Sequence, residues 1–285
     1  MKIISTRIWT AAISAFFAIA ATTAFAAPVT NWVIDPSGVQ TPGNYSGLAT
    51  DSPVIGDGTS NNANSGIITS TIPAVTLLDG ESIILSGSMT IVGAKVTGED
   101  VGFQFGLMYE PGTVPNPVDD KGWLGYKVDN ANAGQVGGAA QGHLRARTTT
   151  GTTFTTATWI SSGSGRDTTI ATVANSVLAN GVFSDGTYNF GIEVERSGAN
   201  ALVSGWILGT GATTFTNVFG PVPVSTATQL TFDFNRVGFW SVTPLDADQI
   251  LFSNVDVSVV PEPSSMVLIG MSLFGVVGFA RRRRS

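Results

Sequence analysis

Residues 187–196 read Thr-Tyr-Asn-Phe-Gly-Ile-Glu-Val-Glu-Arg, a run in which apolar and polar side chains alternate. The apolar side chains, from Tyr188 to Val194, fall on one face of an extended strand, because successive side chains of a strand point to opposite sides. One buried face and one wet face are typical of an antiparallel sheet. The run therefore predicts a strand that packs on a core through one face only.

A tight turn and a second alternating run follow this strand. Ser197 to Asn200 (Ser-Gly-Ala-Asn) has turn residues, and residues 201–208 are its predicted hairpin partner. Nine further runs have strand composition and turn residues at their ends: 66–75, 81–92, 101–109, 123–128, 143–149, 152–160, 213–218, 229–242 and 250–259. About eleven strands joined by short turns predict an all-β fold of two packed antiparallel sheets.

Composition favours the same fold class. The chain is rich in Gly, Thr, Ser and Val and poor in Lys, Glu and Leu, unlike a helical bundle. It contains no cysteine, so packing and not disulfide bonds must stabilise it, and thiolate metal sites are excluded. We expect Trp159, Trp206, Phe239 and Trp240 to lie in the core.

The order of these strands resembles a known fold. The alternating strand at 187–196, its return hairpin, the aromatic pair Phe239-Trp240 and the last run Asn254-Val-Asp-Val257 are similar in pattern to a concanavalin-like or laminin-G-like jelly roll. That resemblance implies a jelly-roll-like sandwich, which we assign to residues 27–259.

The C-terminus has three ordered parts. Pro261-Glu262-Pro263 holds an extended, accessible backbone, since proline neither continues a strand nor starts a helix smoothly. The 17 residues from Ser264 to Ala280 carry no charge, and as a helix they span about 25 Å, slightly short of a hydrocarbon core. A stop-transfer cluster follows, made of Arg281, Arg282, Arg283 and Arg284.

Together these parts resemble the PEP-CTERM sorting signal of Gram-negative bacteria that produce polysaccharide. The resemblance covers residues 260–285 and implies exosortase, a membrane-embedded protease, as a partner. It also implies that the helix and the arginines are removed and that the protein reaches the cell surface or the extracellular matrix. The alternative is a permanent single-pass tail anchor.

The N-terminus has the parts of a signal peptide. Lys2 and Arg7 form a basic region, residues 8–21 are apolar, and Ala24 and Ala26 place small residues where signal peptidase cleaves. We expect residues 1–26 to be removed during secretion. Both ends then predict the same topology, in which the arginines lie on the cytoplasmic side of the membrane and residues 27–260 are exported.

The predicted exported part is acidic. Residues 27–260 contain 8 basic and 19 acidic residues, a net charge of 8 − 19 = −11. This surface repels nucleic acid, so we expect no nucleic-acid partner. It is compatible with neutral glycans or divalent cations, and it also keeps an exported protein soluble.

Few residues suggest catalysis. Glu193 and Glu195 lie two apart on one predicted strand, so their carboxylates share a face at roughly the 6–7 Å that suits a glycosidase pair. The acidic pattern of jelly-roll glucan hydrolases would need a third acid where this chain has Gly198. The single histidine, His143, precedes Arg145 and Arg147 without a nucleophile motif, which indicates a strand residue and not a catalytic base.

Two pairs are candidates for binding. Asp246 and Asp248 offer oxygen ligands for a structural calcium ion, although they lack the ordered spacing of a calcium loop, and turn capping is the alternative. Trp123 and Tyr126 lie on opposite faces of a predicted strand. We therefore expect one ring to point outward and to stack on a sugar.

The sequence thus predicts a non-enzymatic, exported protein of the cell surface or exopolysaccharide, with a matrix or glycan-binding β-sandwich. The first alternative is a surface glycoside hydrolase that uses Glu193 and Glu195. The second alternative is a structural protein without a ligand.

Overall fold

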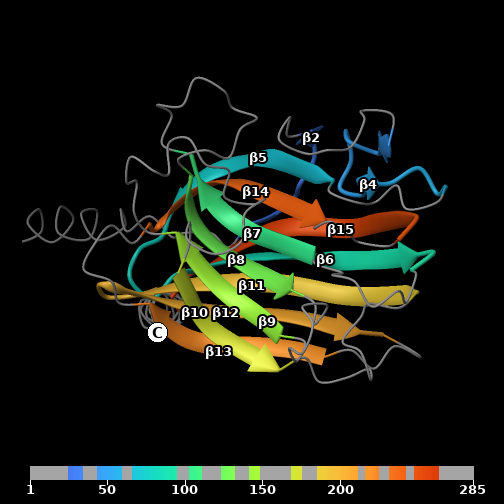
Figure 1. The fold of residues 1–285 in the computed structure, drawn as a ribbon. Helices are drawn as coiled ribbons and strands as arrows, with labels where there is room; N and C mark the ends of the chain where they lie inside the picture. Colours follow the sequence, from blue (N-terminus) through green and yellow to red (C-terminus); the bar gives the residue numbers. More distant parts are fainter. Residues whose placement is uncertain are drawn as a thin grey trace, which may run out of the picture. The chain divides into compact units, whose positions relative to one another are not determined.

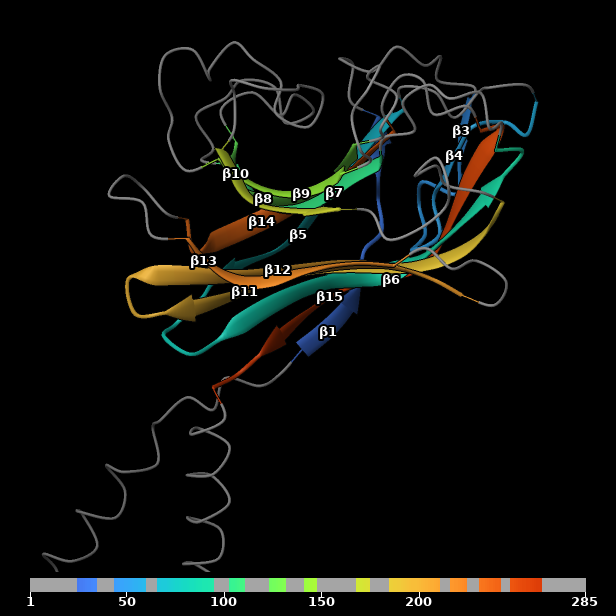
Figure 2. The same ribbon diagram turned by 60° about the horizontal axis from the view of Figure 1, so that its bottom comes forward.

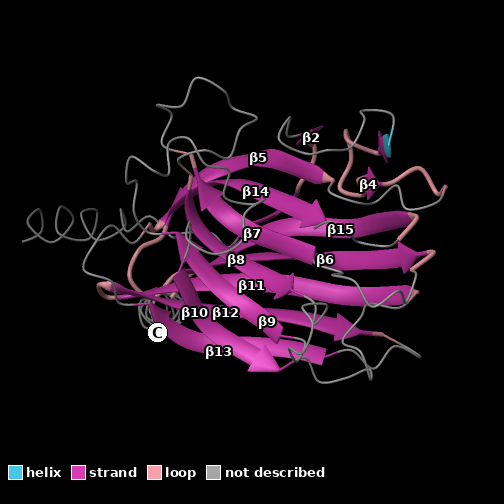
Figure 3. Cartoon of the chain, viewed as in Figure 1, coloured by secondary structure: helices cyan, strands magenta, loops and turns pink. Residues whose placement is uncertain are grey.

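The computed structural model describes residues 25–34, 44–59, 66–94, 103–110, 123–131, 141–147, 168–174, 185–210, 216–224, 231–241 and 247–262. These ranges contain fifteen β-strands, which account for most of their length (Figure 3). Within the same ranges no helix has the length and apolar character needed to cross a bilayer. The predicted all-β class is confirmed.

One sheet has eight strands, each antiparallel to its neighbours. Its main path runs in the order β13 (Thr216–Val224), β12 (Asn200–Gly209), β11 (Gly186–Ser197), β6 (Ser82–Val92), β15 (Gln249–Val260), β4 (Val54–Ile55) and β3 (Tyr45–Ser46). The eighth strand, β1 (Phe25–Pro28), pairs with residues 256–259 of β15. The first strand of the described chain therefore lies beside the last one.

The other sheet has seven antiparallel strands. Their order is β10 (Thr168–Ala174), β9 (Gln141–Arg147), β8 (Leu124–Ala131), β7 (Phe103–Tyr109), β14 (Asp233–Ser241), β5 (Ile67–Thr76) and β2 (Val33–Ile34). The strands are labelled in Figure 1, and Figure 2 shows the two sheets as separate layers. The predicted antiparallel sandwich is confirmed.

Phenylalanine rings from both sheets meet between the layers. Phe239 of β14 stacks on Phe252 of β15, with ring centroids 4.4 Å apart. The ring centroids of Phe105 of β7 and Phe190 of β11 are 5.0 Å apart. Each such pair adds about 0.5–1.5 kcal/mol to the stabilisation from burial alone. This layer is the core, so the face of each sheet that contributes to it is called the inner face and the opposite face the outer face.

The two outer faces differ. On the eight-stranded sheet, β11 and β12 alternate buried inner residues with partly or fully exposed outer ones, except where glycine lacks a side chain. On the seven-stranded sheet, residues 103–108 of β7 are buried on both faces. A second apolar cluster lies on that outer face and consists of Ile67, Met108, Trp123 and Trp240.

Ten of the eleven predicted strand runs overlap strands β5–β9 and β11–β15. The remaining run, 152–160, lies outside the described residues. Strands β1–β4 and β10 were not predicted. Residues 25–260 form one compact unit.

Candidate functional site

Glu193 and Glu195 lie on the outer face of the eight-stranded sheet. They alternate along β11 with buried Ile192 and Val194, and both glutamates are partly buried. Glu193 is opposite Ser204 of β12, and Glu195 is opposite Leu202. The prediction that the two carboxylates share one face is confirmed, whereas their catalytic role stays a prediction.

Trp206 lies on this same outer face, so its predicted place in the core is wrong. It is the cross-strand neighbour of Gly191 and is only partly buried. A Cβ at position 191 would overlap the six-membered ring of the indole, so the ring must cover the glycine. The register of the hairpin thus places a partly buried tryptophan on the face that carries Glu193.

Trp123 and Tyr126 lie on opposite faces of the seven-stranded sheet, as predicted, but both are fully buried. Tyr126 belongs to the core, where its hydroxyl donates to the Thr231 carbonyl at 3.2 Å and burial raises its pKa. Trp123 belongs to the outer apolar cluster. The expectation of an outward, solvent-exposed ring is therefore wrong for both residues.

Four basic side chains share the outer face that carries Trp123. Register places Lys127 of β8 opposite Arg145 of β9, Arg147 opposite Gly125, and Arg236 of β14 opposite Met108. Lys127 and Arg147 are each 1% exposed, and Arg236 is 6% exposed. We call Lys127, Arg145, Arg147 and Arg236 the cationic face.

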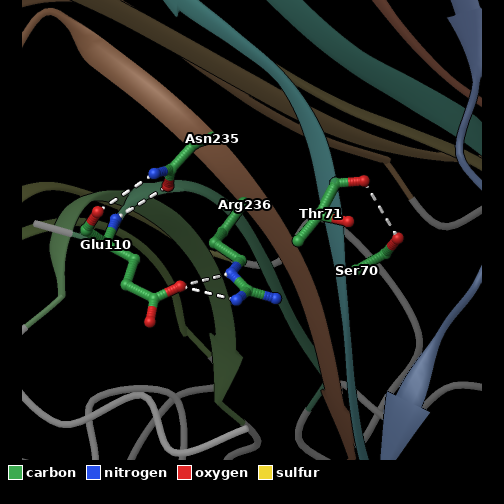
Figure 4. Close-up of polar contacts among 5 residues, drawn as sticks. All are labelled: Ser70, Thr71, Glu110, Asn235 and Arg236. Atoms are coloured by element: carbon green, nitrogen blue, oxygen red, sulfur yellow. Dashed lines mark hydrogen bonds and ion pairs between the residues drawn. The ribbon is translucent and has the colours of Figure 1, made fainter. Parts of the chain in front are cut away.

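Among the described residues, Asp129 and Glu110 form ion pairs with the cationic face. Arg145 Nε lies 2.7 Å from Asp129 Oδ2. Arg236 reaches Glu110 Oε2 with two nitrogens, Nε at 2.7 Å and Nη2 at 2.6 Å (Figure 4). The position of Glu110 is fixed in turn by Asn235, whose side chain accepts from the Glu110 N–H at 2.8 Å and donates to its carbonyl at 3.0 Å.

Trp123 connects the ion pair to the apolar cluster. The Arg236 guanidinium lies over its ring, 5.4 Å from the centroid. The Trp123 carbonyl accepts from Arg147 Nη1 at 3.4 Å. Trp123 therefore contacts two of the four cations. Its ring face attracts the Arg236 guanidinium, and its carbonyl oxygen accepts a hydrogen bond from Arg147.

Several buried polar atoms on this outer face lack a hydrogen-bond partner among the described residues: Thr69 Oγ1, Gln104 Oε1, Trp123 Nε1 and Asp129 Oδ1. Register puts Gln104 of β7 directly opposite Asp129 of β8, so two of these acceptors are neighbours. An unsatisfied buried polar atom costs about 1–3 kcal/mol, and proteins keep few of them. This group is the strongest candidate for a binding site in the described chain.

His143 lies on the same outer face, at its more open side. It is partly buried and opposite Asp129, and its Nδ1 is 3.0 Å from the hydroxyl of exposed Thr172. The prediction that it is a strand residue is confirmed, and it shares its face of β9 with Arg145 and Arg147. It lies on the sheet opposite to the one that carries Glu193 and Glu195, so these residues do not form one site.

The remaining predicted site residues are largely outside the described ranges. Of the calcium pair, Asp248 is described and Asp246 is not, and no group of three or more potential metal-binding side chains occurs in the described ranges. The calcium site stays a prediction.

The processing signals border the sandwich in sequence. Ala26 is exposed in β1, opposite Ser258, and β15 runs to Val260, directly before Pro261 and Glu262. Outside the described residues lie Ala24, Pro263, Arg281, Arg282, Arg283 and Arg284. The last strand thus joins the Pro-Glu-Pro triplet without a linker.

A family model described as the PEP-CTERM protein-sorting motif matches residues 259–284. This segment is a PEP-CTERM sorting signal. A PEP-CTERM signal implies an exported protein that exosortase sorts and processes at the membrane. No curated protein matches the chain.

Several solved structures are similar in fold. Lectin UEA-II complexed with galactose has a TM-score of 0.48 and 10% identity. The match covers 84% of this chain and 98% of the lectin chain. The lectin from Bauhinia forficata in complex with GalNAc has a TM-score of 0.45 and 12% identity, covering 84% and 99%. The Emp46p carbohydrate recognition domain, metal-free form, has a TM-score of 0.42 and 8% identity, covering 80% and 87%.

Sequence reasoning missed Gln104, Asp129, Lys127 and Arg236 as site residues. A signal was present, because Lys127 and Asp129 alternate with Tyr126 and Val128, as Arg145 and Arg147 do with Leu144 and Ala146. Such alternation indicates that the charged side chains of two adjacent strands share one face.

Proposed function

We propose that this chain is an exported, non-enzymatic protein of the cell surface or exopolysaccharide, and that its sandwich binds extracellular glycan through the outer face of the seven-stranded sheet. The observation that carries the proposal is the group of buried, unpartnered polar atoms there, Gln104 Oε1 and Asp129 Oδ1 above all. Acceptors kept without partners are costly to the fold, and a ligand that supplies donors removes that cost.

A sugar has the chemistry that these atoms require. Its hydroxyls donate to Gln104 Oε1 and Asp129 Oδ1 and accept from Trp123 Nε1. A binding site with a few convergent polar groups among aromatic side chains is typical of small-molecule recognition.

The processing partners follow from the two signals. In this proposal, signal peptidase and the secretion machinery act at Ala26, and exosortase acts at Pro261-Glu262-Pro263. The mature protein then lacks Met266 to Ser285 and remains at the surface of a Gram-negative cell or in its extracellular polysaccharide. The charge of −11 on residues 27–260 argues against nucleic acid as a partner.

Replacing Gln104 tests the proposed site. Gln104→Leu removes an acceptor without a described partner, so we expect the free energy of unfolding to rise by about 1 kcal/mol while glycan binding weakens. The measurement is affinity gel electrophoresis of the exported protein in a panel of neutral and acidic polysaccharides that includes the host's own polymer. Ser204→Ala, on the outer face of the other sheet, is the control and should migrate like the wild type.

Two outcomes contradict this function. One is a wild-type protein that no polymer in the panel retards, which would favour a structural role without a ligand. The other is retardation that Gln104→Leu leaves unchanged, which would place the site elsewhere.

The alternative is a glycoside hydrolase that uses Glu193 and Glu195. The observation in its favour is that both carboxylates share an outer face with the partly buried Trp206. Reducing-sugar release from the same polysaccharides decides between the two. Turnover by the wild type that is lost in the Glu193→Gln, Glu195→Gln double variant would establish the enzyme.

A further inference from the structure

We infer that removal of residues 1–26 opens a strand edge at Val259 of β15, directly before the Pro-Glu-Pro triplet, and that exosortase binds this edge by pairing a strand of its own with it. Cleavage of the signal peptide thus precedes C-terminal processing and makes the sorting signal available. This inference rests on the proposed function, because it takes both cleavages from it and specifies how the second protease holds the chain.

Strand β1 covers one edge at the end of β15. Its four residues, Phe25–Pro28, lie antiparallel to residues 256–259 of β15, and Phe25 is opposite Val259 (Figure 2). Strand β6 pairs with the other edge of the same part of β15. Among the described strands, β1 is therefore the one that covers Val259 on the side away from β6.

The hydrogen bonds between these strands determine which backbone groups depend on β1. The Val29 N–H donates to the Val255 carbonyl at 2.8 Å, one register step beyond Pro28. Opposed residues of an antiparallel pair alternate between hydrogen-bonded and non-bonded positions, so steps of two from Val29 make Phe25 and Val259 a bonded pair. Pro28 occupies a non-bonded position, which suits a residue without an N–H.

Cleavage after Ala26 divides β1 in the middle. The first two residues of the strand leave with the signal peptide, and the last two stay opposite residues 256–257 of β15. The backbone N–H and C=O of Val259 then lose the partner that Phe25 provided, while β6 still holds the other edge of β15. A strand edge with unpaired N–H and C=O groups readily pairs with an added strand.

Two observations favour exosortase as the owner of that strand. The family model of the sorting motif matches residues 259–284, so the match begins at the uncovered Val259. In the triplet that follows, only Glu262 has a backbone N–H, because proline has none. A protease that holds the triplet in extended form therefore needs backbone donors from the end of β15, and the open edge offers the Val259 N–H.

The uncovered edge is also close in sequence to the apolar segment. Ser264, where that segment begins, follows Val259 by five residues. A fully extended chain of that length spans at most about 18 Å. A membrane-embedded protease that reaches the triplet therefore works within a few residues of this edge.

Chains of two lengths test the inference. One begins at Ala27, as the mature protein does, and the other begins at Thr23 and so keeps Phe25 opposite Val259; both end at Ser285. Each purified chain is mixed with exosortase-containing membranes of the native host, and mass spectrometry follows the loss of its C-terminus over time. We expect the longer chain to be processed at least about threefold more slowly, since its own strand competes with that of the protease.

Matched variants locate the effect at the backbone. Phe25→Pro in the longer chain keeps the length and removes the N–H that bonds to Val259, so processing should return toward the rate of the shorter chain. In the shorter chain, Val259→Pro removes the donor of the open edge and should slow processing at least about threefold. Val259→Ala keeps that donor and should be processed like its parent. The proline leaves the pairing with β6 in place, because the Val259 N–H points away from that strand.

Each outcome decides the matter. Equal processing of the two lengths overturns the inference and leaves exosortase processing standing, whereas processing of neither chain overturns both. Sedimentation that shows a dimer for the shorter chain and a monomer for the longer one assigns the open edge to a second copy, which also overturns the inference. The two lengths carry no substitution, so a variant that fails to fold does not remove the test.

Discussion

Arg236 reaches Glu110 with two nitrogens on the outer face of the seven-stranded sheet, at 2.7 and 2.6 Å from the same carboxylate oxygen. The side chains are 8% and 11% exposed, so each charge depends on the other to offset the loss of water. Breaking such a pair leaves one charge buried alone, which costs more than the pair itself contributes.

We therefore expect Arg236→Met or Glu110→Gln to lower the free energy of unfolding by about 3 kcal/mol. The double variant should be more stable than either single variant, because it leaves no buried charge alone. Urea denaturation of the four proteins measures this. Additive losses in the double variant would show that the two groups are not coupled.

Trp206 and Gly191 give a second prediction, on the opposite outer face. A methyl group at position 191 would displace the indole, so Gly191→Ala should lower stability by about 1–3 kcal/mol and change the fluorescence of Trp206. Ser204→Ala, on the same face, is the control and should stay within about 0.5 kcal/mol of the wild type. Unchanged stability and unchanged fluorescence in Gly191→Ala would contradict the packing described above.

Asp256 gives a pH-dependent prediction. Burial, and then the nearby charge of Asp51, raise the pKa of this carboxyl above 3.8. The folded protein thus holds the proton more tightly than the unfolded chain. Stability from this group is complete below the unfolded pKa and is lost as pH rises through the folded pKa.

Asp256→Asn removes that loss. We expect the variant to be more stable than the wild type at neutral pH, by no more than about 0.5 kcal/mol, and the difference to vanish or reverse at acidic pH below the unfolded pKa. Thermal unfolding across this pH range measures it. A difference that grows as pH falls would contradict the sign of the pKa shift.

Processing at the C-terminus gives a fourth prediction. Mature protein from the native host should lack Met266 to Ser285, because the proposed exosortase processing would remove the apolar segment and the arginines. Intact-mass measurement of the exported protein decides this. A mass that includes Arg281 to Arg284 would indicate a permanent tail anchor.

Strands with one wet face were predictable from sequence, because their alternation records which side chains are buried. Residues 187–196 were expected as a strand, and β11 spans Gly186–Ser197. Short strands at the N-terminal part were missed, since β2, β3 and β4 have two residues each and exist through pairing with distant strands. A strand of two residues is too short to show the alternation of apolar and polar side chains that predicts a strand.

The site was harder to predict, because burial of an outer face depends on the whole fold. Trp123 was singled out as a candidate, but its burial and its contact with Arg236 arise from strands more than a hundred residues apart. Trp206 was misplaced for a related reason. The hairpin register puts it opposite Gly191, and only that register shows that the ring lies outside the core.

Hydrogen–deuterium exchange with and without a bound glycan tests the central claim most directly. If the outer face of the seven-stranded sheet is the site, the glycan should slow exchange in β7, β8 and β9, around Gln104, Lys127 and Arg145, and leave β11 and β12 unchanged. Protection confined to β11 and β12, around Glu193 and Trp206, would contradict the account and favour the alternative site.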